Sequence, residues 1–137
     1  KEGDPPLQQT PAQTALLSRV AARLAAIAGL SQSHMLSFSL SKCEPGVLPV
    51  ESGEYVEKFG HRVVFVFLND LAGAELRFPR LRFEVRPRSG CAVVWSPVQD
   101  GKEDRRAFHQ GRRPKSETRY AAVMTFTEPG NVSHQKH

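Results

Sequence analysis

The stretch RVVFVFL at residues 62–68 is apolar at every position but the first, and the polar pair Asn69-Asp70 follows it. A short apolar run rich in valine and phenylalanine is typical of a β-strand that is buried on both faces, or on one face beneath a helix. We therefore expect residues 62–68 to form a buried strand that ends at Asn69.

Shorter strand candidates lie on both sides of this segment. Residues 35–42 alternate an apolar side chain with serine over most of their length, which predicts a half-buried strand. Residues 43–60 contain several prolines and glycines and are expected to be an irregular connection. Prolines and glycines also separate the later candidates, which cover residues 76–78, 82–86, 91–95 and 120–126.

Residues 11–28 carry the pattern of an amphipathic helix. Thr10 is a suitable N-cap, Pro11 suits the first helical position, and Gln13 completes a capping box. Apolar side chains then recur at helical spacing, and Gly29 marks the expected end of the helix. One helix followed by many short strands predicts a mainly β fold, in which the helix packs on an antiparallel sandwich or jelly roll.

The length of 137 residues is that of one domain, and a hydrophobic content of 39% allows one modest core. We expect a polar arm at residues 1–10, the domain at 11–127 and a flexible tail at 128–137. The chain begins at Lys1 rather than methionine, which we interpret as the start of a processed or excised segment. No apolar run approaches the roughly 18–20 residues of a membrane span, so no membrane partner is expected.

The cysteine content constrains the compartment only weakly. Cys43 and Cys91 are the two cysteines, which excludes a disulfide-rich secreted scaffold and leaves open one bridge or two reduced thiols. Asn131 begins an N-glycosylation sequon in the expected tail, but this short motif also arises by chance. The sequence leaves the compartment undetermined, with an intracellular location slightly favoured over the secretory route.

Five short motifs follow one another in the second half of the sequence. They are FLND at residues 67–70, GAELRFP at 73–79, VRPRSG at 85–90, RAFHQG at 106–111 and the single residue Arg119. In this order and spacing they resemble the prolyl-4-hydroxylase branch of the Fe(II)/2-oxoglutarate-dependent dioxygenases, over about residues 36–126. The resemblance implies a double-stranded β-helix, a cupin-like jelly roll, with the N-terminal helix on the outer face of the larger sheet.

The resemblance also implies where a site would lie. That family binds Fe(II) with two histidines and a carboxylate, and a basic residue pairs with the far carboxylate of 2-oxoglutarate. His109 stands at the position of the family's distal metal-binding histidine, and Arg119, ten residues later, at that of the basic residue. A guanidinium suits a carboxylate there, because it can bind both oxygens at once.

The other half of the implied iron site departs from the family's pattern. The family has a His-x-Asp pair after a glycine, and the same count from Gly46 gives Ser52 and Glu54. A serine hydroxyl stays protonated and binds Fe(II) poorly, and glutamate is one methylene longer than aspartate. His61 would need a rearranged loop to replace the missing histidine. We therefore expect a degraded iron site, with Fe(II) and 2-oxoglutarate implied by the resemblance but not bound.

Two functions from different classes follow from the resemblance. The favoured one is a domain that has lost iron binding and serves as a non-catalytic binding or structural module, alone or within a larger complex. The alternative is an active dioxygenase that hydroxylates a protein side chain such as proline. In that alternative His109 and Glu54 bind iron, His61 or water supplies a third ligand, and Arg119 anchors 2-oxoglutarate.

The charged segment at residues 99–119 offers a second candidate surface. The chain is basic, with a net charge of +5, which favours anionic partners. The segment is either a solvated loop or a docking surface for an acidic protein or a larger assembly. RNA fits less well, because few aromatic side chains are present to stack on bases. The basic residues of this cluster are Arg105, Arg106, Arg112, Arg113 and Lys115.

The residues of the candidate site also have ordinary structural explanations. His109 is also explained as an ordinary core or loop histidine with satisfied hydrogen bonds. The charged segment around it is either a solvated loop or contains a short buried strand at 107–109 that directs His109 inward. Arg119 could pair with Glu117 as well as with a bound metabolite. Trp95 is expected to pack in the core.

Overall fold

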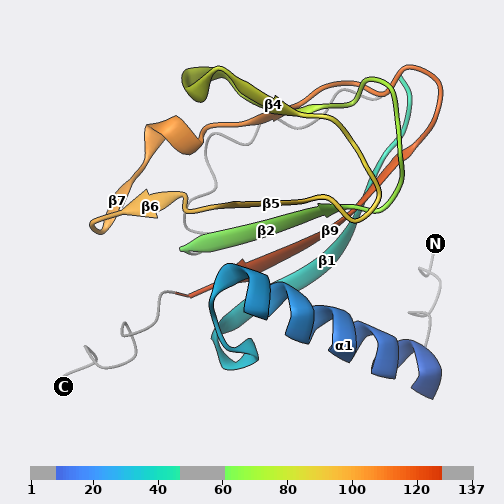
Figure 1. Ribbon diagram of the computed structural model, residues 1–137, viewed down its shortest axis with the longest axis vertical. Helices are drawn as coiled ribbons and strands as arrows, with labels where there is room; N and C mark the ends of the chain where they lie inside the picture. The colour runs from blue at the N-terminus through green and yellow to red at the C-terminus, as the bar shows by residue number, and fades with distance from the viewer. Residues whose placement is uncertain (1–8, 47–60, 128–137) are drawn as a thin grey trace, which may run out of the picture.

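The computed structural model of the chain describes residues 9–46 and 61–127. These residues form a mainly β structure with one α-helix, α1 (Pro11–Ala28), and three single turns of 3₁₀-helix (Figure 1). The strands are β1 (Met35–Cys43), β2 (Arg62–Phe67), β3 (Leu76–Phe78), β4 (Phe83–Val85), β5 (Ala92–Trp95), β6 (Val98–Gln99), β7 (Lys102–Glu103), β8 (Gln110–Gly111) and β9 (Arg119–Phe126). The 3₁₀ turns are η1 (Gln32–His34), η2 (Pro79–Leu81) and η3 (Arg105–Ala107).

Two antiparallel sheets make up most of the fold. The larger sheet has the order β1-β9-β2-β5 and the smaller one the order β4-β3-β8, while β6 and β7 form a separate hairpin. In the larger sheet Phe65 of β2 pairs with Val123 of β9 on one side and with Val93 of β5 on the other. Figure 1 shows the smaller sheet over one face of the larger sheet and α1 over the opposite face.

Strand β2 is buried on both faces, because each face meets a different layer. Val64 belongs to a cluster that includes Leu24 and Ala25 of α1. Phe65 and Phe67 belong to a second cluster, which includes residues of β3 in the smaller sheet. The apolar run that predicts a buried strand therefore lies between the helix and the smaller sheet.

Helix α1 has the bounds that its sequence predicts. The backbone N–H of Gln13 donates to Thr10 Oγ1 at 3.1 Å, and the Thr10 N–H donates to Gln13 Oε1 at 2.9 Å, which completes the capping box. Gly29 ends the helix in the left-handed region at φ 72°, where a glycine has no side chain to strain. Among the described residues, no helix is both long and apolar enough to cross a bilayer.

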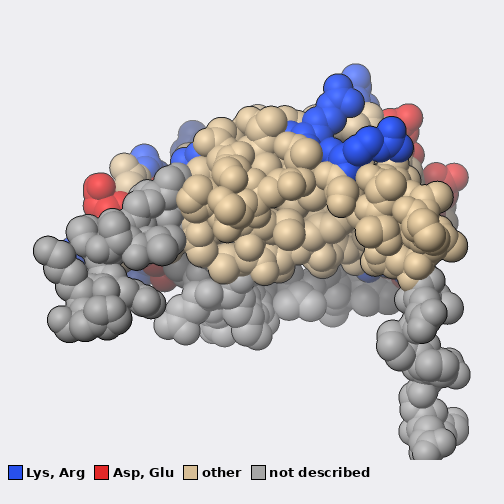
Figure 2. Space-filling view, turned by 90° about the horizontal axis from the view of Figure 1, so that it is seen from below, with Lys and Arg blue, Asp and Glu red and all other residues tan. Residues whose placement is uncertain are grey.

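Strand β1 differs from the expected half-buried pattern. Leu36 and Leu40 are 52% and 69% exposed, and Phe38 alone of the three packs against the α1 cluster. The physical reason is position, because β1 is an edge strand and the buried residues of α1 lie against β2 and β9. Seen from the side on which α1 lies, most of the visible described surface is uncharged, with Lys and Arg gathered near one edge (Figure 2).

The prediction of a short strand at residues 107–109 is wrong. The 3₁₀ turn η3 ends at Ala107, Phe108 and His109 follow it outside any strand, and β8 begins only at Gln110. The Asp104 carboxylate accepts a hydrogen bond from the backbone N–H of Arg106 at 3.0 Å and caps this turn. A side chain that bonds the backbone two residues further on in this way competes with strand pairing.

Candidate functional site

Arg119 is the first residue of β9, and its side chain points between the two sheets. It lies opposite Cys43 of β1, and only 6% of its surface is exposed. Its Cζ atom lies 5.4 Å from the centre of the Phe65 ring, within the range of a cation–π contact. The guanidinium is therefore held against the core cluster that joins the larger and smaller sheets.

The guanidinium of Arg119 makes little use of its donors. Nη1 donates to the carbonyl oxygen of Ala74 at 3.3 Å, a long hydrogen bond, and the buried Nε has no hydrogen-bond partner. Burial lowers the pKa of Arg119, because it disfavours the charged form. No carboxylate of residues 9–46 and 61–127 forms an ion pair with it, Glu117 included. These unused donors fit a carboxylate, which would accept two hydrogen bonds from the guanidinium.

Asn69 fixes the backbone on both sides of Arg119. Its side-chain Nδ2 donates to the carbonyl oxygen of Thr118 at 2.8 Å, and its Oδ1 accepts from the backbone N–H of Tyr120 at 2.9 Å. The sequence marks Asn69 only as the end of a strand. Its two hydrogen bonds assign it a further role, because they determine where β9 begins and thus where Arg119 projects.

His109 lies in an aromatic setting that the sequence does not reveal. The centre of its ring is 4.8 Å from that of Trp95 and 5.6 Å from that of Phe78. Phe78 belongs to the cluster that Arg119 contacts through Phe65, and Trp95 packs against this cluster. Through Phe78 of β3 and Trp95 of β5, His109 therefore contacts the same apolar layer as Arg119. This agrees with the inward direction expected for its side chain.

Burial has the largest effect on the pKa of His109. Burial lowers its pKa, and a backbone hydrogen bond to Ala107 opposes this effect only in part. Nδ1 lies 3.0 Å from the carbonyl oxygen of Ala107. In the neutral ring Nδ1 then carries the hydrogen and donates it, and the lone pair is on Nε2. Metal-binding histidines use this arrangement, and so do ordinary buried ones.

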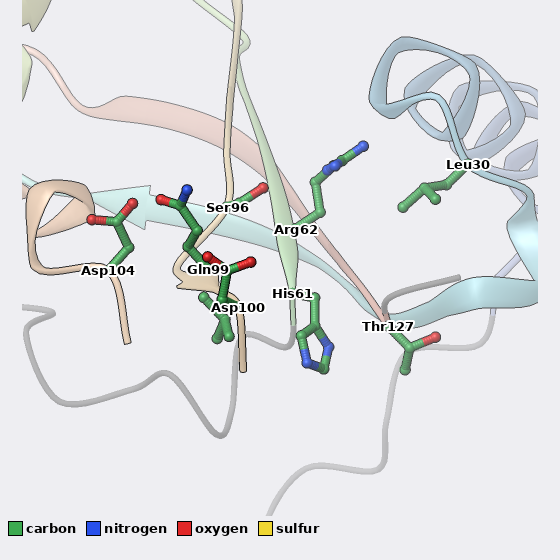
Figure 3. Close-up of a pocket in the computed structure, with 9 residues that line it drawn as sticks. Leu30, His61, Arg62, Ser96, Gln99, Asp100, Asp104 and Thr127 are labelled. Atoms are coloured by element: carbon green, nitrogen blue, oxygen red, sulfur yellow. The ribbon is translucent and has the colours of Figure 1, made fainter. Parts of the chain in front are cut away.

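The other expected iron ligands are not brought together within the described residues. Ser52 and Glu54 lie outside the described residues. His61 lines a pocket of about 300 Å³ at the start of β2, together with Asp100 and Asp104 (Figure 3). Within 9–46 and 61–127, no group of three His, Cys, Asp or Glu side chains could hold a metal ion. Among the described residues, Arg119 is thus suited to bind a carboxylate, and His109 is the one candidate iron ligand at this site.

The five basic residues of the 105–115 cluster have different surroundings. Arg106 pairs with Asp104 at 2.9 Å, and Arg112 lies 3.7 Å from Glu84. The side chain of Lys115 lies beside Gly73. Arg105 and Arg113 are exposed and form no ion pair with another described residue. The structure therefore distributes this cluster over η3, the end of β8 and the following loop.

Comparison with known proteins identifies the fold. Neither a family model nor a curated protein matches the sequence. Two structures of the viral collagen prolyl hydroxylase of Paramecium bursaria Chlorella virus-1 superpose on 85% of the chain. The 2-oxoglutarate complex gives a TM-score of 0.60 at 14% identity over 74% of that protein's chain. The truncated form gives 0.61 at 16% identity over 70% of its chain. The fold is prolyl 4-hydroxylase-like.

A bacterial structure supports the same conclusion. A prolyl 4-hydroxylase of Pseudomonas putida superposes on 93% of this chain and 71% of its own, with a TM-score of 0.53 and 21% identity. At such identities the prolyl 4-hydroxylase-like fold is what the similarity shows. The activity of this chain is a separate question, which the residues of the site must answer.

Proposed function

We propose that residues 11–127 form a double-stranded β-helix domain that binds a small dicarboxylate of the 2-oxoglutarate type through Arg119 and serves as a non-catalytic binding module. The proposal keeps the expectation of a degraded iron site. It departs from the expectation that 2-oxoglutarate is not bound, because the setting of Arg119 favours an anionic ligand.

The observation that carries this proposal is the buried guanidinium of Arg119. A buried charge without an opposite charge loses its hydration and destabilises the fold by several kcal/mol. Among the described residues, Arg119 has the Ala74 carbonyl and the Phe65 ring to offset that loss. A carboxylate that enters between the two sheets would supply the missing charge and accept the unused hydrogen bonds.

The iron half of the proposal rests on ligand chemistry. Fe(II) would supply oxygen activation in this fold, but it requires two imidazoles and a carboxylate on one face of the ion. In this sequence the positions of the family's His-x-Asp pair hold Ser52 and Glu54. A neutral hydroxyl and a longer carboxylate leave His109 as the one ligand that retains both its type and its place in the motif order.

The second candidate function is an active dioxygenase acting on a protein side chain such as proline, and the hydrogen bond of His109 is compatible with it. His109 donates from Nδ1 to a backbone carbonyl, and this contact orients metal-binding imidazoles and places the lone pair on Nε2. In that case Glu54 and either His61 or water complete the iron site, and Arg119 holds 2-oxoglutarate.

Fluorescence and metal analysis distinguish the two functions. Trp95 is the single tryptophan and packs near His109, so its emission reports on ligands between the sheets. We expect 2-oxoglutarate to change this emission without added iron, and the Arg119→Met variant to show no such change. Absence of any binding to the parent chain would overturn the proposal. Stoichiometric iron and succinate production that depends on His109 would establish the dioxygenase instead.

A further inference from the structure

The turn η2 carries an exposed surface that the site described above does not use. Arg80, Leu81, Arg82 and Phe83 follow one another along the chain and are all exposed, Leu81 to 53% and Phe83 to 54%. Turn η2 lies against η3, whose Arg105 is also exposed (Figure 1). We call these five residues the η2 surface.

The cations of the η2 surface differ from their neighbours in having no local carboxylate. Arg77 and Arg112 lie near Glu84, and Arg106 is bonded to Asp104. By contrast, Arg80, Arg82 and Arg105 form no ion pair with any residue in 9–46 or 61–127. Glu84 and Asp104 are therefore already engaged by other arginines, and these three charges remain available to an external anion.

The backbone at Arg82 gives independent support. Arg82 ends η2 in the left-handed region, with φ 52° and ψ 45°. A bulky residue costs free energy in this conformation, whereas glycine or asparagine adopts it with less strain. An arginine at a position where a smaller residue would be less strained is compatible with a functional use of its side chain.

The apolar half of the surface leads toward His109. The ring of Phe83 lies 6.2 Å from that of Phe78, and the ring of Phe78 lies 5.6 Å from that of His109. A partner that covers Phe83 would therefore touch the outer member of a row of rings that ends at the candidate site. Exposed Leu81 and Phe83 beside three cations combine apolar contact with positive charge.

We propose that the η2 surface docks an acidic protein segment that also carries apolar side chains. Its carboxylates would pair with Arg80, Arg82 and Arg105, and its apolar side chains would cover Leu81 and Phe83. Nucleic acid fits less well for two reasons. A phosphate backbone makes no apolar contact with Leu81, and the surface has one exposed aromatic ring, Phe83, on which a base could stack. The proposal does not depend on a ligand at Arg119.

Fluorescence anisotropy tests this docking surface. The probe is a short labelled peptide that alternates glutamate with leucine and phenylalanine. The double variant Arg80→Glu/Arg82→Glu should weaken binding by about tenfold or more. The matched control is Arg19→Glu/Arg23→Glu, which makes the same charge change on the exposed face of α1 and should weaken it less than about twofold.

Further variants separate the apolar and electrostatic parts. Leu81→Ser/Phe83→Ser should also weaken binding, by about fivefold or more, although it leaves the charge unchanged. Arg82→Asn should weaken binding while the melting temperature stays the same or rises, because asparagine tolerates the left-handed backbone. A loss of binding in this variant therefore cannot come from unfolding.

Three outcomes would overturn the proposal. The first is that the peptide does not bind, and the second is that both charge-reversal variants weaken peptide binding equally. The third is that a single-stranded RNA of equal charge binds more tightly and depends on the same arginines. The Trp95 response to 2-oxoglutarate should be unchanged in Arg80→Glu/Arg82→Glu. Failure of the docking surface is thus distinguishable from failure of the dicarboxylate site.

Discussion

The guanidinium of Arg119 reaches along the sheet to the ring of Phe65, although the two residues are not paired. Phe65 pairs with Val123, four residues after Arg119 on β9, yet the Arg119 Cζ lies 5.4 Å from the centre of its ring. The side chain must therefore lean along β9 toward the middle of the sheet. This direction places a positive charge between the two sheets, where the described residues supply no carboxylate for it.

Replacing Arg119 with methionine should stabilise the ligand-free chain. Methionine fills much of the same space and carries no charge, whereas the buried charge of Arg119 has no ionic partner among the described residues. We therefore expect the free energy of unfolding to rise by about 1–2 kcal/mol. Urea denaturation measures this change, with Arg113→Met as a matched control at an exposed position. A loss of several kcal/mol in Arg119→Met would mean that the guanidinium already has a strong partner in the apo protein.

The ligand itself should stabilise the parent chain through its far carboxylate. At about one hundred times its dissociation constant, 2-oxoglutarate should raise the free energy of unfolding by about 2.7 kcal/mol. The matched control is 2-oxobutyrate, which keeps the keto acid but lacks the second carboxylate that Arg119 would bind. Thermal unfolding with each compound provides the measurement. Equal stabilisation by the two compounds would place the ligand away from Arg119.

The burial of His109 predicts a specific pH dependence. Its pKa is lowered from the ordinary 6.5 chiefly by burial, so the unfolded chain takes up a proton at a higher pH than the folded chain does. His109 therefore has no effect on stability well above pH 6.5. Below it, His109 removes stability as the pH falls toward its folded pKa, by up to about 1.4 kcal/mol per pH unit.

The His109→Gln variant isolates this contribution. Unfolding free energies of the variant and the parent chain are compared between about pH 7.5 and about pH 5, so that the other titrating groups cancel. The parent chain should lose more stability than the variant over this interval. Parallel curves would show that His109 titrates alike in the folded and unfolded states.

The sequence predicts the elements that are determined by residues close together along the chain. Helix α1 is set by its capping box and Gly29 and has the predicted bounds. Strand β2 is set by a short apolar run and ends at Phe67, one residue before the predicted end, and Leu68 is exposed. Leu36 and Leu40 of β1 are exposed although their alternating pattern predicts burial, because burial of a strand depends on where α1 crosses the sheet. Which strand becomes an edge is a property of the whole fold.

The sequence names candidate site residues but does not reveal their surroundings. The motif spacing points to His109 and Arg119, and the structure places both beside the same core cluster. Nothing in the sequence reveals that Trp95 and Phe78 flank His109, since these contacts join segments distant along the chain. No strand forms at 107–109, and Ala107 instead ends a 3₁₀ turn that the Asp104 side chain caps. The apolar pattern of a sequence does not reveal a cap of this kind.

Asn69 should control the position of Arg119 without touching a ligand. Its side chain donates to the Thr118 carbonyl and accepts from the Tyr120 N–H, so Asn69→Ala leaves both groups without this partner. We expect a loss of about 1–3 kcal/mol in unfolding free energy. Weaker 2-oxoglutarate binding should accompany it, because a displaced guanidinium aligns poorly with a carboxylate. Asn69→Asp keeps an acceptor for Tyr120 and should bind 2-oxoglutarate better than Asn69→Ala. If both variants bind as the parent chain does, Asn69 does not position Arg119, whatever its effect on stability.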